Sequence, residues 1–179
     1  DETLDLAQRY GDERQTEIIP EEIEAIDIED LIQREDMIVV ISNRGYIKRM
    51  PLSSYRIQGR GGKGRASANL REDDFIQHLF IGSTHDYILF ATSEGKAYYL
   101  KVHQIPEGSR TARGTHVRSL LNVSSDEEIT AVVRFSEFTD DRFLFMATMR
   151  GVVKKVRVSD FRNAKVRGIT AINIAEGDK

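Results

Sequence analysis

The sequence predicts an all-β protein in which about three blades of four short strands form a propeller-like array, preceded by a short helical tail. Three stretches superimpose on a glycine, at Gly45, Gly95 and Gly151, with spacings of 50 and 56 residues. Each glycine stands between an apolar run and a shorter strand-like run, which predicts a hairpin with a tight turn. A β-sandwich of irregular strands is the alternative, and the regular spacing of the repeats disfavours it.

The first residues do not follow this pattern. In residues 1–20, apolar side chains such as Leu4 and Tyr10 precede Gly11, and a proline follows. This order is typical of the last turns of a helix that ends at a glycine. Residues 21–36 are predicted to be an acidic connector, in which the stretch PEEIEAIDI is a candidate first strand of the first blade.

Residues 37–179 are predicted to form the blades. Ahead of the second and third hairpins, the stretches EDDFIQHLFI and DEEITAVVRF predict an acidic turn that leads into a further strand. Each unit therefore offers about four strands. Each copy also has an apolar residue ten positions after its turn glycine and then ends in a cation followed by glycine. The apolar residues are Tyr55, Ile105 and Phe161, and the pairs are Lys63–Gly64, Arg113–Gly114 and Arg167–Gly168.

The charge of the chain is unevenly distributed. Residues 1–36 carry 14 acidic and 3 basic side chains, and the chain totals of 29 and 26 leave 15 acidic and 23 basic ones for the rest. The balances are −11 and +8, so the blades are basic and suit an anionic partner. The acidic segment is either a solvated connector or a shield for the basic body.

Composition excludes several classes of site. The chain has no cysteine, which rules out disulfides and thiolate metal sites and suits a reducing cytoplasm. No apolar run approaches the roughly 18 residues of a membrane span. We therefore expect a cytoplasmic protein without a membrane partner.

The stretch QGRGGKGR, residues 58–65, carries the most specific chemistry. Its glycines fit the spacing of a dinucleotide site, but the following ASANLREDDF is too short and polar to be the required helix. A Walker A loop would need Ser or Thr where Gly64 stands. Two interpretations remain: a flexible loop without a specific role, or a glycine-rich loop that binds the phosphates of a polymer. In the second, exposed N–H groups act with Arg60, Lys63 and Arg65.

The other two repeats carry cations at the equivalent loop positions. Equivalent positions on successive blades lie along one rim, so the loops and the adjoining strands predict a basic arc that contacts DNA phosphates without reading bases. The loop cations are Arg110, Arg113 and Arg118 in the second repeat and Arg162, Lys165 and Arg167 in the third; the strand cations are Lys48, Arg49, Lys101, Lys154, Lys155 and Arg157.

The residues predict no catalytic set and no metal site. The four histidines have no paired ligand spacing, and the carboxylate runs recur at turns, which indicates structural punctuation. The histidines are His78, His85, His103 and His116, and the runs are Asp73–Asp74, Asp126–Glu128 and Asp140–Asp141.

The glycine-rich loop resembles the signature box, usually QRRGGKG, of the C-terminal domain of DNA gyrase A subunits. The matching residues are Gln58, Arg60, Gly61, Gly62, Lys63 and Gly64, and Gly59 replaces the first arginine of the box. The stretches NRGYIKR, STHDYILF and IPEGSRTARG are also similar to that family. YGDERQTEI is similar to the end of the preceding DNA-cleaving domain, so the resemblance assigns residues 1–20 to the tail of that domain. The resemblance covers essentially the whole chain.

The resemblance implies a pinwheel-like variant of the propeller, normally six-bladed, around whose rim DNA wraps. It implies double-stranded DNA as the partner, and the rest of the gyrase A subunit in an A2B2 complex with the B subunit of a bacterial, nucleoid-associated enzyme. The cleavage tyrosine, the ATP site and the Mg²⁺ site would belong to other parts of that complex, so this chain would be non-catalytic and without a cofactor of its own. The alternatives are the equivalent domain of topoisomerase IV and a protein-binding propeller.

Overall fold

The computed structural model describes residues 2–11, 28–54 and 74–179, and the chain divides into two compact units, residues 1–31 and 32–179. The first unit contains helix α1 (Glu2–Tyr10) and the 3₁₀ helix η1 (Ile28–Leu31). An i,i+4 ion pair of 3.3 Å joins Asp5 and Arg9 along α1, and the helix ends before Gly11, as predicted. The candidate first strand PEEIEAIDI lies outside the described residues except for Ile28, which begins η1.

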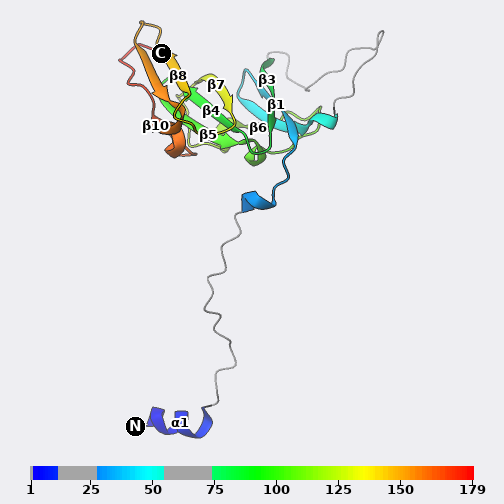
Figure 1. Cartoon of the computed structure of the whole chain (residues 1–179), viewed down its shortest axis with the longest axis vertical. Coiled ribbons are helices and arrows are strands. Elements are labelled where there is room, and N and C mark those ends of the chain that lie inside the picture. The colour runs from blue at the N-terminus through cyan, green and yellow to red at the C-terminus, as the bar shows by residue number, and fades with distance from the viewer. Residues whose placement is uncertain (1, 12–27, 55–73) are drawn as a thin grey trace. The chain divides into compact units, whose positions relative to one another are not determined.

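The second unit consists of three antiparallel sheets in a row (Figure 1). The first sheet has the strand order β3-β1-β2-β6 and the second the order β10-β5-β4-β7, while the third contains β8 and β9. This confirms the predicted array of four-stranded blades for the first two sheets. The bounds are β1 (Asp36–Ser42), β2 (Tyr46–Pro51), β3 (Ile76–Ser83), β4 (Tyr87–Thr92), β5 (Lys96–Lys101), β6 (Thr115–His116), β7 (Ile129–Phe135), β8 (Phe143–Ala147), β9 (Val153–Arg157) and β10 (Ile169–Thr170).

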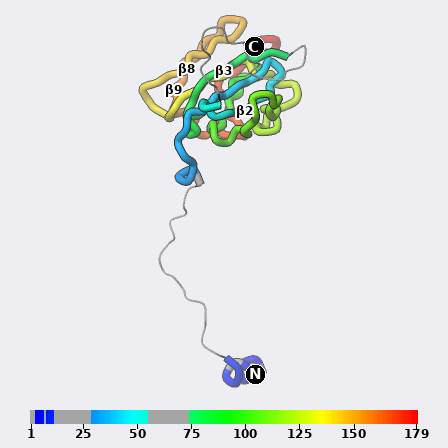
Figure 2. Tube along the Cα trace, turned by 90° about the vertical axis from the view of Figure 1, so that its right-hand side faces the viewer, coloured from blue at the N-terminus to red at the C-terminus, as the bar shows by residue number. Residues whose placement is uncertain are grey.

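Neighbouring repeats are interlocked, which the sequence did not predict. β3 precedes the second hairpin in the chain but pairs with β1 of the first, and β6, which follows the second hairpin, pairs with β2. In the same way, the second sheet receives β7 and β10 from around the third hairpin. Each of the first two sheets thus takes its two outer strands from the next repeat. The third sheet contains β8 and β9 alone within the described residues, where four strands were expected (Figure 2).

The three hairpin turns are built alike. Gly45, Gly95 and Gly151 have φ angles of 79°, 74° and 86°, in the left-handed region that glycine adopts without strain. The carbonyl groups of Phe75, Glu128 and Lys179 each accept a hydrogen bond from the first turn residue of the preceding hairpin.

Acidic side chains cap two of these turns. The Asp74 carboxylate accepts from the N–H of Arg44 at 3.2 Å, and Asp178 accepts from that of Arg150 at 2.9 Å. The bond of Asp74 agrees with the structural role predicted for the acidic runs, and Asp178, which was not among those runs, has the same role in the third turn.

The apolar core lies between the sheets. The first interface is formed by β1, β2, β4 and β5, and its buried side chains include Val39, Phe90 and Leu100. The second lies between the second sheet and the third hairpin and includes Leu89 and Phe161. Burying each such side chain contributes about 1.5–3 kcal/mol. These two interfaces fix the order of the blades and therefore the positions of the loops at their edges.

Candidate nucleic-acid interface

Residues 106–114, here called the first rim loop, lie along the β2 edge of the first sheet. The N–H of Arg49 donates to the carbonyl of Pro106 at 3.1 Å, and the N–H of Gly108 donates back to Arg49 at 3.0 Å. After a turn closed by a bond from Ala112 to Ser109, the chain returns beside β2 as β6. The loop therefore belongs to the second repeat but is attached to the first blade.

Residues 162–168, the second rim loop, occupy the corresponding edge of the second sheet. The N–H of Tyr99 donates to the carbonyl of Lys165 at 3.3 Å, and the Tyr99 hydroxyl donates to that of Arg162 at 3.2 Å. β10 then pairs with β5 as β6 pairs with β2. The two loops thus stand at equivalent edges of adjacent blades.

The second rim loop exposes three cationic side chains. Arg162 donates to the carbonyl of Phe138 at 3.2 Å. Lys165 and Arg167 are exposed and form no ion pair within the described residues. Lys165 has a φ of 21°, close to the limit of the left-handed region. This loop matches the arrangement that the sequence predicts for phosphate binding.

In the first rim loop, the two arginines are half-buried. The guanidinium of Arg113 lies over the Tyr46 ring, 5.1 Å from its centroid, and the ring of His116 meets Tyr46 edge-on at 5.3 Å. Nε of Arg110 is shielded from solvent and has no hydrogen-bond partner within the described residues. The ring of Tyr46 thus fixes the guanidinium of Arg113, whereas the Nε–H group of Arg110 has no acceptor among the described residues.

Lys48 departs from the expectation that it contacts DNA. Its side chain is only 1% exposed, and Nζ donates to the carbonyl groups of Ser109, Arg110 and Ala112 at 3.2, 2.7 and 2.8 Å. Burial lowers the pKa of Lys48. We leave it out of the proposed DNA-contacting set, because a phosphate cannot reach an ammonium group enclosed by the loop.

Arg49 is also engaged by the protein. Its Nε donates to the carbonyl of Ile105 at 2.7 Å, and its guanidinium pairs with Glu107 at 3.5 Å. On β9, Lys154 donates to the carbonyl of Ala171 at 2.6 Å, and Lys155 lies over the Phe143 ring at 4.0 Å. Both lysines are exposed, so they remain candidates, whereas Arg49 mainly fixes the start of the first rim loop.

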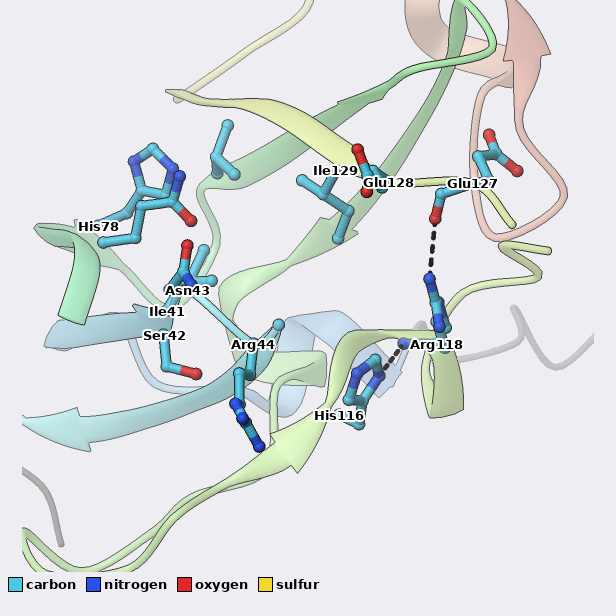
Figure 3. Close-up of a pocket in the computed structure, with 13 residues that line it drawn as sticks. Ile41, Ser42, Asn43, Arg44, His78, His116, Arg118, Glu127, Glu128 and Ile129 are labelled. Atoms are coloured by element: carbon cyan, nitrogen blue, oxygen red, sulfur yellow. Dashed lines mark hydrogen bonds between the residues drawn. The ribbon is translucent and has the colours of Figure 1, made fainter. Parts of the chain in front are cut away.

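Arg118 does not lie in the first rim loop but in a groove between the first two blades (Figure 3). The groove has a volume of about 410 Å³, and its lining includes Arg44, His78 and His116. Arg118 donates to the carbonyl of Glu127 at 3.0 Å, and its N–H donates to Nδ1 of His116 at 3.2 Å. The structure therefore separates Arg118 from Arg110 and Arg113, with which the sequence groups it.

Glu127, which the sequence places in a structural acidic run at a turn, has a buried carboxylate that the sequence did not predict. Its carboxylate is fully buried and accepts hydrogen bonds from the Thr92 hydroxyl, the Tyr98 hydroxyl and the N–H of Ser124. Burial, together with the charge of Glu127, raises the pKa of Tyr98. The sequence carries a partial signal for the burial of Tyr98, the partner of Glu127. Side chains alternate along β5, so Tyr98 lies on the same face of the strand as the buried Leu100.

The predicted box residues Gln58, Arg60, Gly61, Gly62, Lys63, Gly64 and Arg65 lie outside the described residues. Within the residues that the structure does describe, no cluster of three or more His, Asp or Glu side chains is arranged to hold a metal ion. In the same residues, none of the helices combines the length and the apolar character needed to cross a membrane.

Comparison with known families decides the assignment of this interlocked array. The model of the DNA gyrase C-terminal domain, a β-propeller, matches residues 36–83, 86–136 and 142–179. The chain belongs to the DNA gyrase C-terminal domain family. The first two matched segments run from the first strand of a hairpin to the outer strand supplied by the next repeat, β1 to β3 and β4 to β7. The family repeat therefore groups each hairpin with the strand that follows it, β3 or β7, while the fourth strand of each of these sheets, β6 or β10, lies in the next matched segment.

Sequence relatives agree with the gyrase family. The chain is 56% identical over 177 residues to the DNA gyrase A subunit of Treponema pallidum, covering 99% of this chain and 22% of the relative. It is 46% identical to the DNA gyrase A subunit of Mycolicibacterium smegmatis, covering 100% of this chain and 21% of the relative. The chain thus spans about a fifth of the length of these gyrase subunits.

Solved structures share the gyrase-type fold. A DNA gyrase A C-terminal domain matches with a TM-score of 0.64 at 28% identity, covering 81% of this chain and 46% of that one. The C-terminal domain of a DNA topoisomerase IV matches with a TM-score of 0.69 at 27% identity, covering 82% and 44%. Because the fold is common to both enzymes, the sequence relatives and not the structural ones favour gyrase.

Proposed function

We propose that this domain binds double-stranded DNA without reading its sequence and wraps it around the edge formed by the rim loops. The observation that carries this proposal is the repetition of a cationic loop at the same edge of two adjacent blades, each loop accepting a hydrogen bond from the backbone N–H of the fourth residue after the turn glycine, Arg49 or Tyr99. Cationic side chains repeated along the edge of adjacent sheets favour a long polyanion over a small ligand.

The proposed contacts are with phosphates. Arg110 and Arg113 in the first rim loop and Lys165 and Arg167 in the second are the main contacts, because none of the four forms an ion pair within the described residues. Lysine and arginine on the backbone of a duplex position it but carry no sequence information. Further contacts come from Arg162, Arg118, Lys154 and Lys155, and, outside the described residues, from the loop of residues 58–65.

Wrapping needs an anchor as well as a track. Bending 20–30 base pairs by 40–90° costs on the order of 1–6 kcal/mol, which several phosphate contacts must offset. We assign the anchor to the box residues, above all Arg60 and Lys63, and the track to the two rim loops. The box would then determine the path of the DNA more than its affinity.

In the complete enzyme, this domain would present one DNA segment to another with fixed handedness, so that ATP-driven strand passage introduces negative supercoils. We assign the cleavage tyrosine, the ATP site and Mg²⁺ to other parts of an A2B2 complex that acts on the bacterial chromosome in the cytoplasm. The contribution of this chain is DNA binding and geometry, and catalysis belongs to the other parts.

Substitution of the anchor tests this assignment. Replacing Arg60 and Lys63 with Ala in a complete gyrase A subunit, within the A2B2 enzyme, should abolish supercoiling and leave relaxation and most DNA binding intact. The matched control replaces Arg162 and Lys165 with Ala, which removes two charges from the second rim loop; it should lower affinity and retain supercoiling. A box variant that supercoils DNA as the unmodified enzyme does would contradict the proposal.

A further inference from the structure

Lys48 of the first blade forms its hydrogen bonds with a loop that belongs to the second repeat. The three acceptor carbonyls, on Ser109, Arg110 and Ala112, are 61 to 64 residues away in the sequence. An ammonium group has three N–H donors and no acceptor, and here carbonyl oxygens of the loop accept from it three times. A buried lysine with this partner set is bound to the loop backbone and cannot serve as a surface charge.

These bonds hold the part of the first rim loop that no sheet holds. The loop is attached to the strand at Gly108 through Arg49, and β6 pairs with β2 from Thr115 onward. Between these points, the backbone bond from Ala112 to Ser109 closes the turn without joining it to the blade. Within the described residues, the hydrogen bonds that join this turn to β2 are therefore those of Lys48, and Arg113 adds a contact with the Tyr46 ring.

The glycines at the two ends of the loop allow it to close on the lysine side chain. A Cβ atom on Gly108 would lie 3.4 Å from Cβ and Cδ of Lys48, and one on Gly114 would lie 3.2 Å from Cβ of Lys48. Gly114 also has a φ of 94°, which other residues adopt only with strain. The loop backbone thus packs directly on the aliphatic part of the side chain.

The repeats show that this position is a support for the next loop. Tyr98 stands where Lys48 stands, three residues after the turn glycine, and is likewise buried at 1% exposure beneath the next cation–glycine pair. Tyr98 directs its hydroxyl to Glu127, whereas Lys48 directs its ammonium to loop carbonyls. The buried side chain at this position therefore supports the first rim loop through a charge and the second through packing.

We propose that Lys48 is a positioning residue for DNA binding: through its three carbonyl partners, it holds the first rim loop in the conformation that presents Arg110 and Arg113 to phosphates. This inference rests on the proposed function of the rim loops. In this proposal Lys48, a residue of the first repeat, supports the DNA contacts made by Arg110 and Arg113 of the second repeat. The predicted direct contact between Lys48 and DNA is replaced by an indirect role.

A double-mutant cycle separates the indirect role from a direct contact. Affinity for a 40-base-pair duplex is measured across salt concentrations for Lys48→Met, for Arg110→Ala with Arg113→Ala, and for the triple variant. If Lys48 acts through the loop, Lys48→Met lowers the salt slope by about 1.8, as the loss of two contacts does, and the triple variant shows no further loss. Additive losses would overturn the proposal. The control Lys155→Met should lower the slope by no more than about 0.9 and add fully to either background.

Hydrogen exchange of the free protein gives a readout that does not depend on DNA. The amides of residues 110–114 should exchange at least tenfold faster in Lys48→Met and at an unchanged rate in the double arginine variant. Unchanged exchange in Lys48→Met would overturn the anchoring role. Should Lys48→Met not fold, Lys48→Gln, whose amide keeps two N–H donors, should exchange at an intermediate rate. Failure of the unmodified chain to bind duplex at 50 mM salt would contradict the proposed function instead, and the exchange result would still decide the anchoring role.

Discussion

Gly168 lies against the ring of Tyr98 so closely that a Cβ atom on residue 168 would come within 2.5 Å of Tyr98 Cε1. Gly168 has a φ of 72°, so both its conformation and its contact require glycine. Gly114 occupies the same place in the first blade, where a Cβ atom would lie 2.5 Å from the carbonyl oxygen of Ile47. In the two cation–glycine pairs that the structure describes, the glycine thus packs against the preceding blade.

These contacts predict unequal effects of alanine at the glycines. Gly151 also has a positive φ, but a Cβ atom on it would meet nothing within 4 Å, so Gly151→Ala should cost only the backbone strain of about 1–2 kcal/mol. Gly168→Ala should cost about 1–3 kcal/mol more, because the Tyr98 ring must move. Urea unfolding measures both free energies. Equal losses would show that the Gly168 contact with Tyr98 is not tight.

Removal of the buried carboxylate of Glu127 should be strongly destabilising. In Glu127→Ala, the hydroxyl groups of Thr92 and Tyr98 and the N–H of Ser124 lose their acceptor inside the protein. We expect a loss of about 3 kcal/mol in the free energy of unfolding. The neighbouring Glu128→Ala removes only an exposed ion pair with Lys179 and should change stability by less than about 0.5 kcal/mol. Similar thermal melting of both variants would contradict the network.

The cap formed by Asp178 should make the third hairpin sensitive to acid. Hydrogen bonds from the Thr148 side chain and the backbone N–H groups of Arg150 and Lys179 lower the pKa of Asp178 below the ordinary value of about 3.9. The stabilisation is therefore complete above about pH 4 and is lost as the pH falls through the lower, folded-state pKa. The difference in stability between the unmodified chain and Asp178→Asn should be constant near neutrality and shrink below about pH 4. A constant difference down to about pH 2 would contradict the shift.

Two arginines near the rim should respond differently to substitution. Arg167 is exposed without an ion pair among the described residues, so Arg167→Ala should reduce the salt slope of DNA binding by about 0.9 and leave stability unchanged. Arg49 donates to Ile105 and pairs with Glu107, so Arg49→Ala should lower stability by about 1 kcal/mol and leave the slope unchanged. Titrations at four salt concentrations and urea melts measure both. The reverse pattern would mean that the structural and DNA-contacting arginines have been exchanged.

The sequence predicted the hairpins because their determinants are local. Gly45, Gly95 and Gly151 lie between runs with strand periodicity, and all three predicted turns are present, with each glycine at a positive φ. The assignment of the outer strands could not be predicted in this way. β3 pairs with β1 and β6 pairs with β2 through contacts between repeats, and the sequence of one repeat carries no signal for which hairpin an outer strand will join.

The candidate site shows a similar division. Lys165 and Arg167 are exposed at the edge where the repeat pattern predicts cations. Lys48 looked equivalent to them because its charge is visible in the sequence, whereas its burial depends on a loop more than sixty residues away. Comparison with Tyr98 gives the missing signal, because an aromatic residue at the same repeat position indicates an inward-facing side chain.

The most direct test of the account is the salt dependence of duplex binding by the chain. If Arg110, Arg113, Lys165 and Arg167 each contact a phosphate, the logarithm of affinity should fall linearly with the logarithm of salt, with a slope at least as steep as about −3.6, because the further contacts add to it. Between 50 and 200 mM salt, the affinity should then fall at least about a hundredfold, equally for duplexes of different sequence. An affinity that changes less than about twofold over this range would contradict the proposal that the rim binds DNA through its phosphates.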